Sequence, residues 1–282
     1  MRLASYRDAS GPSVGVLNGD GLVDLRALTG SLAPSLRDLL AAGQLDRVRE
    51  YAARASADVP ADAVTYLPVI PDPSKIIGVG LNYRSHRDEA SRAPVGHPTL
   101  FLRVADSQIG HRGQAMKPAA SRQFDYEGEL AVVIGTTCRN VPPDGAATVL
   151  AGYSCYNDFS VRDWQRHTSQ WTAGKNFTAT GAFGPALVTP DEVPDLASLA
   201  IRTRVNGETR QSAVIGDLLF PIPELISYVS TFTTLRPGDV LITGTPAGVG
   251  LYRDPPDFLQ AGDVVEVEVE QIGTLTNEVT DA

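Results

Sequence analysis

An acidic stretch at residues 124–134 carries the side chains best suited to chemistry. Its apolar, β-branched end predicts a β-strand, in which alternation places Asp125, Glu127 and Glu129 on one face. Like charges this close repel one another, so such a face is stable in water, after protonation, or around a cation. Gly128 lacks a Cβ and leaves room on the reverse face for another backbone or side chain. The stretch is therefore either a solvated strand face or a site for a hard divalent cation.

A histidine and a glutamate three residues apart follow a predicted strand and a Gly-rich turn at 78–80. On a helical turn His86 and Glu89 face the same side, so the carboxylate can orient the imidazole. This arrangement is that of a general base. A single histidine is also commonly structural, and the residues alone leave both roles open for His86.

Two aspartates follow the apolar residues 149–153. Either Asp158 or Asp163 could add a third carboxylate to the cation, which completes an oxygen-rich set of the kind that Mg²⁺, Mn²⁺ or Ca²⁺ prefers. The alternative for Asp158 is a helix cap, because Asn-Asp before Ser-Val-Arg-Asp also resembles a helix N-terminus.

Two loops could contact a substrate. Lys175, flanked by glycine and aromatic residues, could pair with a carboxylate or an enolate, although an exposed loop lysine is the simpler interpretation. The glycines of residues 242–250 would let backbone amides approach a ligand closely, and Thr245 could donate its hydroxyl. Flexible loop glycines are the alternative there. The stretch is not a phosphate-binding P-loop, because no Gly-Lys-Ser/Thr follows.

The first 70 residues predict a small accessory domain that contains both strands and helices. Asn18-Gly19 between two apolar runs predicts a β-hairpin. Residues 34–55 show helical spacing of apolar side chains, and Gly43 divides the run into two short helices. Four prolines between residues 60 and 73 predict a linker, so the domains are expected at residues 1–70 and 74–282.

The larger domain is predicted to be mostly β, which makes the whole chain an α+β protein. Helices are expected at 145–151, in part of 158–168 and at 223–232. Valines and glutamates alternate over residues 263–270, which predicts a strand with one buried and one solvated face. Beside the acidic strand, the strands expected here are 75–79, 99–103, 186–188, 200–205, 239–243 and 263–270.

The composition predicts a globular protein that acts on small molecules. The chain has 282 residues, 43% of them hydrophobic, which is enough to bury a sizeable core. Its net charge of −9 and the absence of a Lys/Arg run argue against nucleic-acid binding. It shows neither the apolar run of a signal peptide nor a stretch that could span a membrane. We therefore expect a cytoplasmic protein, with Cys138 and Cys155 as free thiols.

Taken together, these stretches resemble the fumarylacetoacetate hydrolase family, and the resemblance covers residues 74–282. The motifs occur in the order and approximate spacing that the family shows. They are Gly80-Leu81-Asn82-Tyr83-x-x-His86-x-x-Glu89, Asp125-Tyr126-Glu127-x-Glu129-Leu130, Asn157-Asp158-x-Ser160-x-Arg162-Asp163, Gly174-Lys175 and Gly244-Thr245-Pro246-x-Gly248-Val249-Gly250.

The resemblance implies a β-roll catalytic domain behind a small N-terminal α/β domain, assembled as a homodimer. It also implies that Glu127, Glu129 and Asp158 bind the metal, with Mg²⁺ or Mn²⁺ expected and Ca²⁺ as a further option. Asp125 would then be a neighbour of the metal ligands.

The resemblance implies the remaining roles as well. His86 and Glu89 match the family's catalytic pair, and Lys175 matches its lysine near metal and substrate. Substrate contacts are expected from Thr245 and Gln170. Many relatives have Lys-Pro where this chain has Arg103 and Val104, so Arg103 is expected to hold a substrate carboxylate in a bidentate manner.

The expected reaction is metal-dependent hydrolysis of a C–C bond in an acylpyruvate-like or other 2,4-dioxo acid. Water activated by His86 and Glu89 would attack the distal carbonyl, and the metal and Lys175 would stabilise the enolate that leaves. Decarboxylation of a 2-oxo acid such as oxaloacetate, or isomerisation of a 2-hydroxy-diene-dioate, are alternatives on the same site. An alternative of another class is a non-catalytic β-protein with a structural Ca²⁺.

Overall fold

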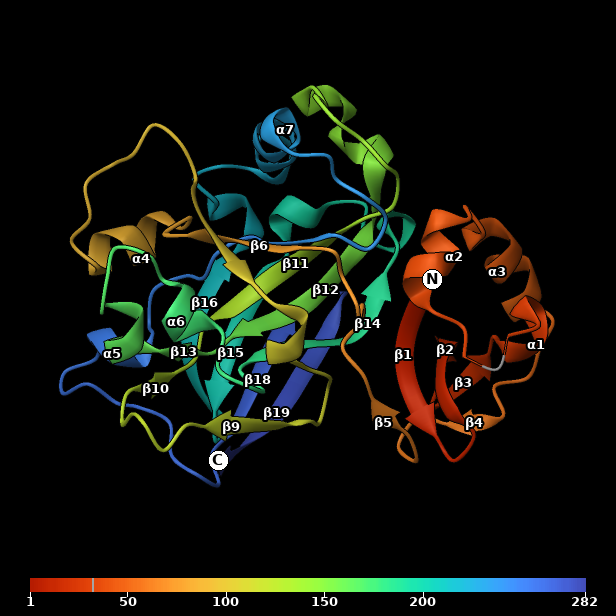
Figure 1. Ribbon diagram of the computed structural model, residues 1–282, viewed down its shortest axis with the longest axis horizontal. Coiled ribbons are helices and arrows are strands. Elements are labelled where there is room, and N and C mark those ends of the chain that lie inside the picture. Colours follow the sequence, from red (N-terminus) through yellow and green to blue (C-terminus); the bar gives the residue numbers. More distant parts are fainter. Residues whose placement is uncertain (32) are drawn as a thin grey trace.

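A computed structural model describes residues 1–31 and 33–282, which form three β-sheets with short helices around them (Figure 1). The largest sheet has 12 strands, and two of them, β5 (Thr65–Tyr66) beside β1 and β8 (Gln108–Ile109) beside β14, lie off its main path. That path runs β4 (Val59–Pro60), β3 (Gly21–Asp24), β2 (Gly11–Asn18), β1 (Arg2–Asp8), β14 (Gly181–Val188), β12 (Leu150–Asp158), β11 (Gly128–Ile134), β17 (Val240–Ile242), β6 (Ile76–Gly80) and β7 (Thr99–Arg103).

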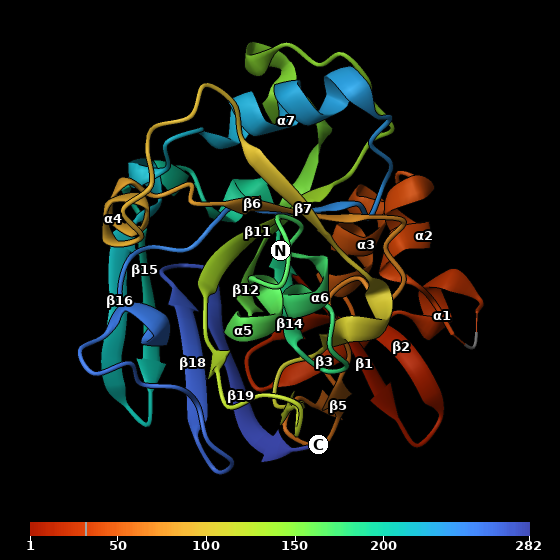
Figure 2. The ribbon, with the colours of Figure 1, turned by 60° about the vertical axis from the view of Figure 1, so that its left-hand side comes forward.

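A second sheet of five strands packs against β11, β12 and β14 of the first (Figure 2). Its inner valines, such as Val265 and Val267, share one core with Leu130 and Val132 of β11. A third sheet is the short pair β10 (Phe124–Asp125) and β13 (Ser160–Val161). The order of the second sheet is β16 (Glu208–Val214), β15 (Ala200–Val205), β18 (Val264–Val269), β19 (Gly273–Asp281) and β9 (Gln114–Lys117).

Strand β11 is apolar at every position after Glu129 because both of its faces are buried. Leu130 and Val132 face the core shared with the second sheet, whereas Ala131 and Val133 face a core that helix residues of the N-terminal segment complete. A strand covered on both faces shows a continuous apolar run in place of alternation. The helices are α1 (Arg26–Thr29), α2 (Leu36–Ala41), α3 (Leu45–Ala52), α4 (Arg84–Glu89), α5 (Arg162–Gln165), α6 (Thr172–Lys175) and α7 (Ile222–Phe232).

The mostly β, α+β fold predicted from the sequence is confirmed. The predicted hairpin is present as β2 and β3, and α2 and α3 lie on either side of Gly43, whose φ is +62°. Glutamates of β18 lie on its outer face, where Glu268 pairs with Arg204 of β15. The predicted strands are found within a few residues as β6, β7, β14, β15, β17 and β18, and β14 begins earlier than expected, at Gly181.

Two predicted elements are wrong in part. The acidic stretch is not one strand, because it divides into β10 and β11 at Tyr126 and Glu127. There the Asn157 side chain accepts the Glu127 N–H at 3.1 Å, in place of a strand partner. The helix expected at 145–151 is a 3-10 helix that ends at Val149, since Leu150 already begins the buried strand β12.

The N-terminal strands extend the large sheet. Strand β1 pairs antiparallel with β14, where Arg2 lies opposite Val188 and Leu3 opposite Leu187. Figure 1 shows the N-terminal segment at one end of the molecule, beside β14. The division into domains at residues 1–70 and 74–282 stays a prediction.

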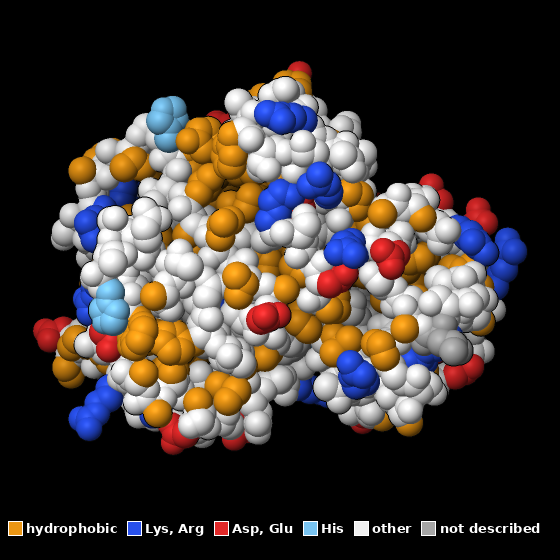
Figure 3. Space-filling view, viewed as in Figure 1, with side chains coloured by type: hydrophobic (Ala, Val, Ile, Leu, Met, Phe, Trp, Pro, Cys, Tyr) orange, Lys and Arg blue, Asp and Glu red, His pale blue; other side chains and the backbone are white. Residues whose placement is uncertain are grey.

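The surface agrees with the expectation of small-molecule partners. On the face shown in Figure 3, Lys and Arg side chains are scattered among Asp and Glu and form no large basic patch. Within residues 1–31 and 33–282, no helix is long and apolar enough to cross a membrane.

His111 lies where the N-terminal segment meets the rest of the chain. Its ring packs edge-on against Tyr66 of β5, with ring centroids 5.0 Å apart, and its Nδ1 accepts the Thr276 N–H at 3.1 Å. Burial lowers the pKa of His111 to about 4, and the charge of Arg112 adds to this effect. The folded protein therefore holds His111 neutral.

We expect acid to destabilise the protein through His111. The pKa in the unfolded chain is about 6.5, so the stabilisation is complete above that pH and is lost as the pH falls towards 4. Urea unfolding should be measured at pH 7 and pH 5. Between these pH values, the free energy of unfolding of the wild type should fall by about 1–2 kcal/mol more than that of His111→Gln. Parallel losses in both proteins would contradict this role.

Candidate metal centre and active site

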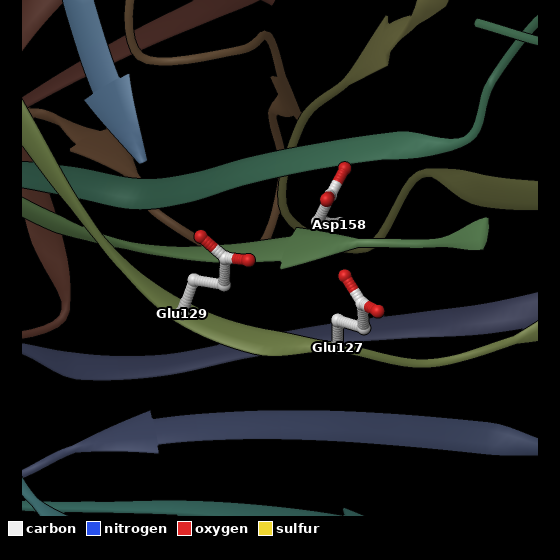
Figure 4. A group of neighbouring side chains, drawn as sticks. All are labelled: Glu127, Glu129 and Asp158. Carbon is white, nitrogen blue, oxygen red and sulfur yellow. The ribbon is translucent and has the colours of Figure 1, made fainter. Parts of the chain in front are cut away.

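Three buried carboxylates meet where β11 and β12 lie side by side (Figure 4). Glu127 directly precedes β11, Glu129 is its second residue, and Asp158 is the last residue of β12. Each offers an oxygen, and these oxygens all lie within 4.8 Å of one another. The side chains are buried: Glu127 is 5%, Glu129 1% and Asp158 0% exposed. The solvated-face interpretation is therefore wrong for Glu127 and Glu129.

Gly128 is needed for this arrangement. A Cβ at Gly128 would lie 2.0 Å from Oγ1 of Thr203 in the second sheet, so no larger residue fits without a shift of β15. The Gly128 N–H donates to Oε1 of Gln211 at 2.9 Å. The reverse side of the strand is thus pressed against the second sheet, as predicted from the lack of a Cβ, and both glutamates point the other way.

Three cationic side chains surround the carboxylates. Lys175 Nζ donates to Glu127 Oε2 at 2.6 Å, and also to Asp158 and to the Ser160 hydroxyl. Arg103 pairs with the opposite oxygen of Asp158. The third cation, Arg162, pairs with Glu127 Oε1 at 2.5 Å. Charges buried this deeply require such partners.

The two glutamates differ in their electrostatic surroundings. Burial raises the pKa of Glu127, but Lys175 and Arg162 outweigh it and hold that pKa well below its usual range. The pKa of Glu129 lies well above its usual range, because burial and the charges of Asp158 and Glu127 disfavour its ionised form. Its recorded hydrogen bond is from the Gly244 N–H, at 2.7 Å. A hard divalent cation fits this all-carboxylate donor set and would balance the charge of Glu129.

Asp125 does not join the three carboxylates. Its Oδ2 pairs with Arg162 Nε at 2.7 Å, and its oxygens accept the N–H groups of Gly250 and Leu251. Arg162 thus bridges Asp125 to Glu127. Asp125 thus lies beside the three carboxylates, and it does not share a strand face with the glutamates.

The predicted pair of His86 and Glu89 is formed on helix α4. His86 Nδ1 lies 3.0 Å from Glu89 Oε2, and the other Glu89 oxygen accepts the Gly248 N–H at 2.9 Å. The carboxylate is therefore fixed on both oxygens. With Nδ1 engaged, Nε2 is the imidazole nitrogen left for a substrate.

The glycine-rich loop 244–251 holds the protein's own carboxylates. Its backbone N–H groups donate to Glu129, Glu89 and Asp125. Among the described residues these amides therefore act on the site's acids, whereas the sequence suggested that they approach a ligand. The loop therefore connects the three clustered carboxylates to the His86–Glu89 pair.

A cavity of about 70 Å³ lies between His86 and two of the three clustered carboxylates, Glu127 and Glu129. It has room for several water-sized groups, since one water needs about 10–15 Å³. Phe101 and Trp171 form an aromatic wall, and the ring of Trp171 packs where Gly80 has no Cβ. The predicted site residues that line the cavity are His86, Glu127, Glu129, Lys175 and Thr245.

Of the three residues predicted to contact the substrate, one lines the cavity. Thr245 lines it, but the Thr245 hydroxyl donates to the Gly128 carbonyl and accepts from Gln211. Arg103 is not among the lining residues and pairs with Asp158. Gln170 is exposed, lies outside the lining, and its recorded hydrogen bonds are to Thr168 through its backbone. A substrate role for these three residues stays a prediction.

Five polar lining residues were not predicted: Arg92, Arg162, Gln165, Arg166 and Tyr252. A sequence signal existed for Arg162, because an arginine beside the apolar Val161 needs buried carboxylates, and the acidic stretch supplies them. Arg162 Nη1 also contacts Gln165 Oε1 at 3.1 Å, so it is Gln165, and not Gln170, that reaches this site.

The family model described as "Fumarylacetoacetate (FAA) hydrolase C-terminal" matches residues 75–280. The chain belongs to the fumarylacetoacetate hydrolase family. This membership confirms the resemblance inferred from the motifs, and with it the expectation of an enzyme.

Named relatives cover nearly the whole chain. "Oxaloacetate tautomerase FAHD2A, mitochondrial" from Bos taurus is 39% identical over 287 residues, which cover 99% of this chain and 91% of the relative. Because that relative is named as mitochondrial, the cytoplasmic location stays a prediction.

Solved structures of similar enzymes show the same fold. Maleylpyruvate hydrolase from Sphingobium sp. SYK-6, in complex with manganese(II) and pyruvate, is 30% identical with a TM-score of 0.85, and the match covers 100% of both chains. The 5-carboxymethyl-2-hydroxymuconate delta-isomerase from Mycobacterium smegmatis is 32% identical with a TM-score of 0.79, over 100% of this chain and 99% of that one. The expected family fold is thereby confirmed.

Glu129→Gln should remove metal binding and leave the fold intact. The neutral amide resembles the protonated glutamate that burial favours and keeps an oxygen for the Gly244 N–H. Calorimetry should show that Mn²⁺ affinity falls at least about tenfold. The melting temperature of the metal-free protein should change by no more than about 2 °C.

The matched control is Glu266→Gln on β18, which makes the same exchange away from the cavity. It should leave Mn²⁺ affinity unchanged. Wild-type affinity in the Glu129 variant would remove Glu129 from the set of metal ligands.

Proposed function

We propose that this enzyme moves a proton beside the carbonyl group of a small 2-oxo acid, as in the tautomerisation of oxaloacetate. Glu127, Glu129 and Asp158 would hold Mg²⁺ or Mn²⁺, with Ca²⁺ as a further option. The observation that carries the proposal is that His86, which Glu89 orients, lines one small cavity together with Glu127 and Glu129 of the carboxylate cluster. The similarity to an oxaloacetate tautomerase over 99% of the chain supports it.

Each part of the site has a defined task. When bound, the divalent cation supplies positive charge that stabilises negative charge on the substrate's carbonyl oxygen. Lys175 adds a second positive charge at the cavity wall, where three acceptors fix its ammonium group. Its Nζ also lies 5.0 Å from the centre of the Phe101 ring. Charges fixed before the reaction need no reorganisation during it.

His86 is the base that transfers the proton. Its Nε2 accepts a proton from C3 of the 2-oxo acid, and the electron pair of the broken C–H bond forms the C2=C3 double bond. The C2 oxygen then gains the proton, which completes the change from keto to enol form. Glu89 stabilises the imidazolium that forms between the two transfers, because its Oε2 lies 3.0 Å from Nδ1.

Hydrolysis of an acylpyruvate, the reaction expected first from the sequence, is the second candidate. The fold match to a maleylpyruvate hydrolase solved with pyruvate favours it. His86 would take a proton from water, the resulting hydroxide would attack the distal carbonyl, and the C–C bond would break with its electron pair on the pyruvate fragment. Decarboxylation of oxaloacetate would need no attacking water.

A homodimer, implied by the family, stays a prediction.

His86→Gln should lower kcat/KM about 100-fold or more, since a positioned acid–base group contributes roughly 10²–10⁴ to a rate. Glu89→Gln should lower it less, because the imidazole remains. His167→Gln is the control, since His167 is exposed and not part of the cavity lining. Stopped-flow measurement of enol decay with saturating Mg²⁺ checks this. Full activity in His86→Gln would exclude the proposed base.

A comparison of two substrates should decide the reaction. Fresh enol oxaloacetate with enzyme and Mg²⁺ should lose its ultraviolet enol absorbance faster than with Mg²⁺ alone, and proton NMR should show no pyruvate above background. EDTA should abolish the acceleration. Cleavage of acetylpyruvate to acetate and pyruvate, with enol decay at the background rate, would instead favour the hydrolase; faster release of pyruvate from oxaloacetate would favour the decarboxylase.

A further inference from the structure

Two arginines lie at the solvent-facing part of the active-site cavity. Arg92 and Arg166 line it and are exposed, whereas Glu127, Glu129 and Lys175 line its buried part. Arg92 lies in the segment between α4 and β7, and Arg166 directly follows α5. Neither belongs to the motifs by which the family was inferred.

Across residues 1–31 and 33–282, neither of these two arginines pairs with a carboxylate. Arg92 has no side-chain partner in that part of the chain. Arg166 Nη2 donates to the neutral amide oxygen of Gln123 at 2.8 Å. By contrast, Lys175 and Arg162 are paired with carboxylates at the buried end. The acidic side chains that line the cavity are Glu127 and Glu129, so its outer part has cations without anions.

A buried donor in the wall of the same cavity also lacks an acceptor. Arg162 is 3% exposed and lines the cavity, and no partner for its Nη2 is found among the described residues. Buried donors are normally satisfied, so an unused guanidinium nitrogen at a cavity wall indicates that a ligand supplies the acceptor. This observation is independent of the charges of Arg92 and Arg166.

We propose that Arg92 and Arg166 form a subsite for a second carboxylate, and that the substrates are therefore 2-oxo dicarboxylates. This inference rests on the proposed function, which places the 2-oxo acid end of the substrate at the buried carboxylates. The other end then extends towards the two exposed arginines. Guanidinium groups bind carboxylates through paired hydrogen bonds and select them over neutral groups of similar size.

The position of Arg92 connects this subsite to the catalytic pair. Arg92 follows Glu89 by three residues, and its N–H donates to the Arg87 carbonyl within the last turn of α4. A carboxylate held by Arg92 therefore fixes the chain just after the helix that carries His86 and Glu89. Loss of Arg92 should affect kcat as well as KM, whereas loss of Arg166 should act mainly on KM.

Two ligands of equal carbon number test the subsite by direct binding. Oxaloacetate carries a distal carboxylate where 2-oxobutyrate carries a methyl group. Calorimetry with Mn²⁺-loaded wild-type protein should give a Kd for oxaloacetate at least about tenfold below that for 2-oxobutyrate. Arg92→Gln and Arg166→Gln should each weaken oxaloacetate about tenfold and change 2-oxobutyrate by less than about twofold.

Arg84→Gln is the matched control, because Arg84 is an exposed arginine of α4 that does not line the cavity. It should leave both ligands unchanged. Three results would overturn the subsite. The Arg92 and Arg166 variants could bind oxaloacetate as tightly as the wild type does, or they could bind both ligands more weakly to the same extent. The third is a wild-type protein that binds oxaloacetate and 2-oxobutyrate equally well.

Failure of the proposed function would look different. Deuterium exchange at C3 of 2-oxobutyrate, followed by proton NMR, reports proton transfer without using the distal carboxylate. No exchange above the Mn²⁺ background would reject the proton-transfer proposal, while a preference for oxaloacetate that depends on Arg92 and Arg166 would still support the dicarboxylate subsite.

Discussion

The structure depends on the burial of four carboxylates at the junction of β10, β11 and β12. Asp125, Glu127, Glu129 and Asp158 are all nearly inaccessible to solvent. Each ionised group loses several kcal/mol of hydration free energy on burial. Only close, well-oriented partners can compensate for this loss. Arg103, Arg162 and Lys175 supply three positive charges for these four acids. One negative charge is left without a cationic side chain, and a divalent cation held beside Glu129 would more than offset it. The proposed metal site and the internal ion pairs are therefore parts of one electrostatic unit.

The surrounding fold is arranged to bring backbone donors to these acids. The backbone N–H groups of loop 244–251 donate to Glu129, Glu89 and Asp125, and therefore fix the clustered carboxylates relative to the His86–Glu89 pair. On the other side of the strand, Gln211 binds both the Gly128 N–H and the Thr245 hydroxyl. The second sheet and the glycine loop thus hold β11 from two directions, which is the rigidity that a preorganised site requires.

Local rules were sufficient for part of this site, and long-range pairing explains the rest. The same-side placement of Glu127 and Glu129 follows from strand alternation, and the contact of His86 with Glu89 follows from helical spacing, so both were predictable. Asp125 does not join the other carboxylates because it binds Arg162, which lies 37 residues later in the sequence. No local pattern reveals that contact. The strand order of the large sheet could not be predicted from local patterns either, because β11 pairs with β17, more than 100 residues away in the sequence. Gln170 was favoured for its nearness to Lys175 in sequence, yet Gln165 reaches the cavity through Arg162.

The buried end of the cavity alone does not distinguish tautomerase, decarboxylase and hydrolase. Each reaction needs charge stabilisation at a carbonyl oxygen, and tautomerisation and hydrolysis also need a base, the role proposed for His86. They differ in whether a water molecule reaches the distal carbonyl, and that depends on what occupies the outer part of the cavity. In a four-carbon substrate such as oxaloacetate, the carbon at that end is an anionic, poorly electrophilic carboxylate, which water does not readily attack. For a substrate of this length, the arginines proposed to bind the distal carboxylate would therefore favour proton transfer over hydrolysis.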